Sequence, residues 1–170
     1  MPSLVWSTSH AVFVTEIDDE HKELFEAISR VQDALTSRGS VAEVYKLAER
    51  LKSCLAEHCA HEERLMRAAR YGSARWHQRS HRAALGRVGQ FVSRLEQGET
   101  AAGHELVEYL TSWLPDHASV ADRMMGSALR NHQRCMAKMT FRAGTKPADA
   151  CTWVDTKGDV LHPGNDGERS

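Results

Sequence analysis

The sequence predicts an all-α protein: an up-down-up-down antiparallel four-helix bundle with an N-terminal arm and an irregular C-terminal extension. Apolar residues recur at steps of three and four along four stretches, which is the period of a helix with one buried face. Capping residues and glycines separate these stretches, and the connections are short enough to make consecutive helices antiparallel. We expect the arm at residues 1–17, the bundle at 18–135 and the extension at 136–170.

The first helix is expected from about Asp18 to Arg38. Asp18 or Asp19 is the expected N-cap, and Gly39 ends the helix. Its buried face is formed by Leu24, Phe25, Ile28, Val31 and Leu35.

The second helix starts at Ser40, because Ser40-Val-Ala-Glu43 matches a capping box, and Tyr71-Gly72 closes it. Its buried face carries Val44, Leu47, Ala48, Leu51, Leu55, Leu65 and Met66. The third helix is expected from about Ser73 to Gly98, with Ala84, Leu85, Val88, Phe91, Val92 and Leu95.

The fourth helix is expected from about Thr100 to beyond Leu129. Its apolar positions are Leu106, Leu110, Trp113, Leu114, Val120, Ala121 and Met124. Pro115 has no N–H to donate to the carbonyl of Thr111, so we expect a kink two residues before His117. In the extension, a short extended piece is expected at Cys151-Thr-Trp-Val154.

The composition argues against several classes of partner. Lys and Arg total 22 and Asp and Glu total 23, so a net charge of −1 gives no support for a nucleic-acid or anionic-membrane partner. No apolar run approaches the ~18 residues of a membrane span. The N-terminus lacks a secretion signal, so we expect a cytoplasmic protein. The four cysteines of the chain lack CxxC spacing and are expected to be thiols: Cys54, Cys59, Cys135 and Cys151.

Seven ionisable residues interrupt the apolar faces of the four predicted helices: His21, His58, Glu62, His77, His81, His117 and Asp122. A single HxxxE or HxxxH pair is common, but here every helix contributes to the same interior. Two of the seven are carboxylates, and an unpaired buried carboxylate is costly, so a cation must compensate them. Imidazole with carboxylate suits iron, manganese, zinc or copper. Seven donors are too many for one ion, which predicts two metal ions bridged by the two carboxylates.

In its order of histidines and carboxylates, the chain resembles the hemerythrin family, and it looks most like a bacterial hemerythrin. The order is His21, His58-x-x-x-Glu62, His77-x-x-x-His81 and His117-x-x-x-x-Asp122. The surroundings agree: Trp6, the segment from Ile17 to Phe25, Glu62-Glu63-Arg64-Leu65-Met66, and Trp113-Leu114. The resemblance covers roughly residues 4–130.

The resemblance implies a non-haem di-iron centre that binds O2 reversibly, with two iron ions (Fe2+/Fe3+) and an oxo or hydroxo bridge. It implies that one iron is held by His77, His81 and His117, and the other by His21 and His58, with an open position for O2. Glu62 and Asp122 would bridge the two. The implied walls of the O2 pocket are Leu24, Cys59, Trp113, Leu114 and Ala118.

At several positions the chain departs from the family's pattern. Cys59 stands where the family usually has phenylalanine, and Ala118 where it has isoleucine. These changes are either neutral or they make the pocket wider, wetter or redox-active. Cys54 lies where an aromatic residue is frequent. His61 is next to Glu62 but off the apolar face, so we expect it at the surface or against a ligand rather than as a ligand.

Two functions therefore remain open. The chain is either an O2-binding protein for storage, delivery or sensing, or a di-iron oxidase or a peroxide- or NO-consuming enzyme. A structural zinc site is disfavoured because no cysteine has the spacing for one. The protein partner, if there is one, is not indicated.

Overall fold

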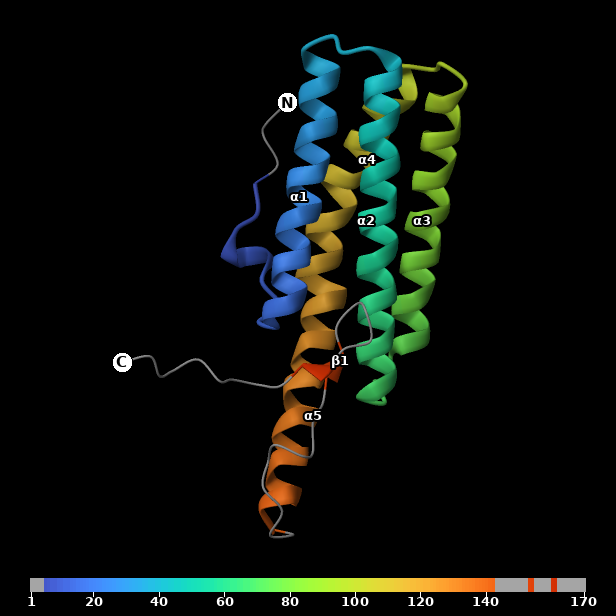
Figure 1. The fold of residues 1–170 in the computed structure, drawn as a ribbon. Coiled ribbons are helices and arrows are strands. Elements are labelled where there is room, and N and C mark those ends of the chain that lie inside the picture. Colours follow the sequence, from blue (N-terminus) through green and yellow to red (C-terminus); the bar gives the residue numbers. More distant parts are fainter. Residues whose placement is uncertain (1–4, 143–152, 155–159, 162–170) are drawn as a thin grey trace, which may run out of the picture.

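Four antiparallel helical rods form the protein, which confirms the predicted all-α four-helix bundle (Figure 1). The computed structural model describes residues 5–142, 153–154 and 160–161. The first three rods are α1 (Thr15–Thr36), α2 (Val41–Ala68) and α3 (Ala74–Glu96). The fourth rod is continuous through α4 (Ala101–His117), the π-helical segment η2 (Ala118–Asp122) and α5 (Arg123–Arg142).

The helix ends differ in detail from those expected. Helix α1 begins at Thr15 and not at Asp18, whose carboxylate instead accepts hydrogen bonds from the N–H groups of Val12 (2.8 Å) and Phe13 (3.1 Å). Asp18 therefore caps the backbone of the arm, not the helix. The expected cap at Ser40 is present, because its hydroxyl accepts a hydrogen bond from the Glu43 N–H at 3.2 Å. After α3, Gly98 adopts a left-handed conformation (φ 90°), as its role as a stop requires.

The C-terminal part of the chain stays helical longer than expected. Helix α5 runs to Arg142, so the first residues of the expected extension are not irregular, and α5 projects beyond the other rods (Figure 1). Strands β1 (Trp153–Val154) and β2 (Val160–Leu161) pair antiparallel, and β1 coincides with half of the expected extended piece. The rest of the expected extension lies outside the described residues.

The N-terminal arm is fixed against the fourth rod. It contains a short 3-10 helix, η1 (Thr8–His10). The Arg123 guanidinium donates to the carbonyl oxygen of Ser9 at 2.6 Å, and Arg130 donates to that of Val12. Val12 is fully buried there. These contacts close the end of the bundle at which α1 begins.

Two apolar clusters fill the interior, and a polar layer separates them. The larger cluster lies between all four rods and includes Leu24, Leu55, Val88 and Leu114. The smaller one contains Val12, Ile17, Leu65, Met66, Met125 and Leu129. On α1, α2 and the fourth rod the predicted metal ligands lie in sequence between members of the two clusters, and on α3 they lie between the partly buried Ala74, which packs against the smaller cluster, and Val88 of the larger one. None of the helices among the described residues is long and apolar enough to cross a membrane.

Candidate metal centre

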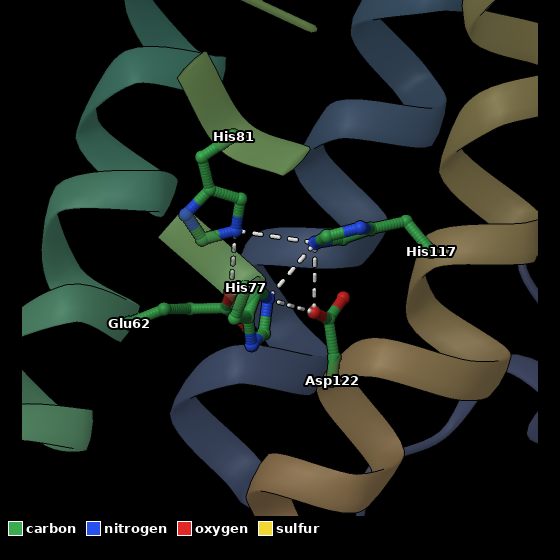
Figure 2. A group of neighbouring side chains, drawn as sticks. All are labelled: Glu62, His77, His81, His117 and Asp122. Carbon is green, nitrogen blue, oxygen red and sulfur yellow. Dashed lines mark hydrogen bonds and ion pairs between the residues drawn. The ribbon is translucent and has the colours of Figure 1, made fainter. Parts of the chain in front are cut away.

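All seven predicted ligand residues meet in this polar layer. Each is buried, and the most exposed, His117, retains only 6% of its accessible surface. Figure 2 shows five of them, with the rings from α3 and α4 and the carboxylates of Glu62 and Asp122 pointing toward one another. Ligand atoms within 4.8 Å of one another form two groups that could each hold a metal ion. The first group is Glu62, His77, His81, His117 and Asp122, and the second is His21, His58, Glu62 and Asp122.

The first group is built around three imidazole Nε2 atoms. His117 Nε2 lies 3.0 Å from His77 Nε2 and 3.1 Å from His81 Nε2. Asp122 Oδ1 lies 2.9 Å from His77 Nε2 and 3.0 Å from His117 Nε2. Two ligand atoms at right angles around an ion, with bonds of about 2.1 Å, are about 3 Å apart. The spacing in this group is therefore that of neighbouring ligands around one ion.

Each carboxylate presents one oxygen to each group. Glu62 Oε2 lies 3.1 Å from His81 Nε2, while Glu62 Oε1 lies 3.7 Å from His58 Nε2. Asp122 Oδ1 faces the three-histidine group, while Asp122 Oδ2 lies 3.1 Å from His21 Nε2. This is the arrangement that two carboxylates bridging two ions require.

Unsatisfied polar atoms also fit a bound cation. Both oxygens of Glu62 and of Asp122 are buried without a hydrogen bond of good geometry among the described residues, as are His21 Nε2 and His58 Nε2. Such groups cost free energy unless a partner is supplied. Metal ions coordinated by these nitrogens and oxygens would satisfy all of them at once.

In the metal-free state, protonated histidines balance the buried carboxylates. Burial lowers the pKa of His58, but Glu62, Glu20 and Asp122 outweigh burial and raise it to about 9. In the same way Asp122 and Glu62 raise the pKa of His77 to about 9 against the effect of burial. Burial and mutual repulsion raise the pKa of Glu62 and Asp122, yet the surrounding histidines hold both below their usual values. The site thus retains anionic carboxylates and must release protons when a metal binds.

The π-helical segment η2 brings Asp122 to the same side of the rod as His117. Asp122 follows His117 by five positions, and in an α-helix the residue at i+5 points well away from residue i. In η2 the backbone bonds span five residues, as the Arg123 N–H donating to the Ala118 carbonyl shows. Pro115 lies inside α4, and the π-helical segment begins three residues after it, between the two ligands.

Outward-facing nitrogens of the histidines have partners of their own. Glu20 accepts hydrogen bonds from His58 Nδ1 (2.9 Å) and His61 Nδ1 (2.5 Å). His117 Nδ1 lies 3.2 Å from Ser80 Oγ, and His81 Nδ1 lies 3.4 Å from Glu63 Oε1. An Nδ1–H that donates outward leaves the Nε2 lone pair free for a metal. His61, expected at the surface or against a ligand, is 5% exposed and shares Glu20 with His58.

Four of the five expected wall residues belong to the larger apolar cluster or pack against it: Leu24, Cys59, Trp113 and Leu114. Leu24, Cys59, Leu114 and Ala118 are buried, and Trp113 stacks on the His117 ring with a centroid distance of 4.3 Å. Burial, followed by the negative charges of Glu62 and Asp122, raises the pKa of Cys59, so its thiol stays protonated.

Fold and site together define a class: a four-helix bundle whose interior brings together histidines and carboxylates in two groups that could hold metal ions. Comparisons with known proteins agree. The family pattern "Hemerythrin HHE cation binding domain" matches residues 12–129. A bacteriohemerythrin of Pseudomonas aeruginosa is 30% identical over 144 residues, which cover 85% of this chain and 93% of that protein. Myohemerythrin-1 of Phascolopsis gouldii is 29% identical over 118 residues, which cover 69% and 87%. The chain belongs to the hemerythrin family.

Proposed function

We propose that this chain holds two iron ions and binds O2 reversibly, in a role of storage, delivery or sensing. One observation carries the proposal: two adjoining donor groups share Glu62 and Asp122 but are unequal, with five residues in one and four in the other. The smaller group has the fewer protein donors, so an external ligand would bind there. The similarity to bacteriohemerythrin supports a bacterial origin.

Iron supplies the electrons for reversible O2 binding, while the protein supplies orientation and the exclusion of water. The outer ring nitrogens of three histidines are held in place by neighbouring side chains. Glu20 holds His58, Ser80 holds His117 and Glu63 holds His81. Leu24 and Leu114, each 1% exposed, belong to the larger apolar cluster and would supply the apolar part of the O2 pocket. A dry apolar wall favours release of O2 as O2, because protons and water are needed for its departure in reduced form.

The alternative of a thiol-assisted redox enzyme is less well supported. A thiolate, and not a thiol, is the reactive form of cysteine. Cys59 is 2% exposed and packs in the larger apolar cluster, and the raised pKa of its thiol keeps the proton in place. Cys59 therefore acts here as a small apolar residue.

Metal analysis and optical spectroscopy test this proposal. We expect two iron ions per chain after maturation with ample iron, and a visible absorption band that appears with O2 and disappears under vacuum over repeated cycles. One zinc ion per chain, or no metal, would refute the di-iron assignment. Irreversible oxidation coupled to turnover of an added reductant would instead establish an oxidase.

A further inference from the structure

A pocket of about 260 Å³ leads from the surface between α1 and α2 toward the smaller donor group. Its lining consists of Glu20, Glu23, Leu24, Cys54, Glu57 and His58. Leu24 and His58 are buried, with 1% and 3% exposure, whereas Glu23 and Glu57 are exposed. Of the four residues of the smaller group, His58 lines the pocket. Its Nδ1 is hydrogen-bonded to Glu20 of the pocket lining, while its Nε2 faces Glu62 within the group, so the pocket ends against the outer side of this imidazole.

The outer part of the pocket is lined by carboxylates, whereas Glu20 at its inner end is hydrogen-bonded to His58 and His61. Three of its six lining residues are carboxylates, and no lysine or arginine lines it. Nearby carboxylates outside the pocket are paired, Glu26 with Arg30 and Glu49 with Lys52. Among the described residues, by contrast, Glu23 and Glu57 form no ion pair. Their charge acts on Cys54 in the pocket lining: after burial, Glu57 raises the pKa of Cys54 most, Arg50 opposes it, and Glu23 raises the pKa by a smaller amount.

We propose that this pocket is the route by which small ligands reach the smaller donor group, and that Glu23 and Glu57 select uncharged ligands over anions. The inference rests on the proposed function and adds its ligand class. A narrow opening lined by one sign of charge lowers the local concentration of ions of that sign. Neutral diatomic molecules such as O2 and NO pass, whereas azide, nitrite and superoxide are disfavoured.

The first test measures azide binding to the diferric protein by stopped-flow absorption. In the double variant Glu23→Gln/Glu57→Gln we expect azide to associate roughly fivefold faster at low ionic strength, with a weaker dependence on salt. Association of O2 with the reduced protein should change less than about twofold, since a neutral molecule does not feel the charge. The control Glu96→Gln/Glu108→Gln removes two exposed charges from α3 and α4, away from the pocket, and should leave the azide rate unchanged.

The second test needs no iron. In a Cys135→Ser/Cys151→Ser background, Cys54 is the thiol that lines the pocket, while Cys59 is buried. Cys54 is alkylated by neutral iodoacetamide or anionic iodoacetate, and the ratio of the two rates cancels any change in its thiolate fraction. We expect the iodoacetate-to-iodoacetamide ratio to rise roughly fivefold in the Glu23→Gln/Glu57→Gln variant and to stay constant in the control.

The outcomes separate the two proposals. An iodoacetate-to-iodoacetamide ratio that is the same in the Glu23→Gln/Glu57→Gln variant as in the unchanged protein would show that these carboxylates do not select against anions and would overturn the inference. Normal iron content with equal azide rates in all variants would also overturn it while leaving the proposed function intact. A protein that holds no iron would refute the proposed function, whatever the alkylation ratio.

Discussion

Gly126, on α5, offers a test of how the N-terminal arm closes the bundle. A methyl group at this position would lie 2.6 Å from the Val12 carbonyl oxygen, 3.3 Å from Val12 Cβ and 3.2 Å from a guanidinium nitrogen of Arg130. The first distance is shorter than any stable carbon–oxygen contact. Replacement by alanine must therefore push the arm away from α5.

The expected cost follows from what that movement breaks. Glycine to alanine inside a helix normally stabilises by about 0.5–1 kcal/mol, because alanine loses less backbone entropy. Here the shift disturbs the Arg130–Val12 hydrogen bond and the packing of the fully buried Val12. Overpacking costs about 1–3 kcal/mol and loss of a charged hydrogen bond about 1.5–3 kcal/mol. We expect Gly126→Ala to lower the free energy of unfolding by about 1–3 kcal/mol.

Urea unfolding followed by circular dichroism measures this, on samples of equal iron content. Gly86→Ala and Gly89→Ala are matched controls within α3, because an added methyl group at either position meets no atom within 4 Å. They should stabilise the protein by about 0.5–1 kcal/mol. If Gly126→Ala stabilises the protein as the controls do, the arm does not pack on α5 as described.

Three further outcomes are expected at the centre itself. Glu62→Gln should lower both the metal content and the melting temperature, because it removes a charge shared by both donor groups; metal analysis showing two ions per chain would contradict this. The stability that His58 and His77 give the metal-free protein should be complete below their ordinary pKa of 6.5 and lost as pH rises through about 9; urea midpoints that rise over this range would contradict it. Cys59→Phe with Ala118→Ile should slow the decay of the oxygenated form at equal iron content, because larger apolar walls exclude water; equal or faster decay would show that other side chains already seal the site.

Helical periodicity was sufficient to predict the bundle and to bring the seven ionisable residues into one layer. It works because the apolar face and the ligands obey the same spacing: His21 precedes Leu24, and His58 precedes Glu62, by steps of three and four. The structure adds that the apolar residues form two clusters with the ligands between them.

Features that depend on contacts between rods, or on the backbone of one rod, could not be predicted in this way. Glu20 lies off the apolar face of α1, and only the packing of α1 against α2 shows that it holds both His58 and His61. His61 was expected at the surface or against a ligand, and only the contact between α1 and α2 shows that it is buried and bonded to the Glu20 that also holds His58. The early start of α1 depends on Asp18 binding the arm, which local capping rules do not distinguish from an N-cap.

The π-helical turn makes the centre sensitive to chain length in one direction only. Removing one residue between Ala118 and Ala121 would convert η2 to an ordinary α-helical turn, with the carboxylate four residues after His117 and still on its side. Adding one residue would place it six positions away, where no regular turn returns it to that side. Because α5 follows Asp122 directly, the deletion would also preserve the phase of Met125 and Leu129 relative to the carboxylate. Shortening at this point is thus compatible with the same pair of ligands, whereas lengthening is not.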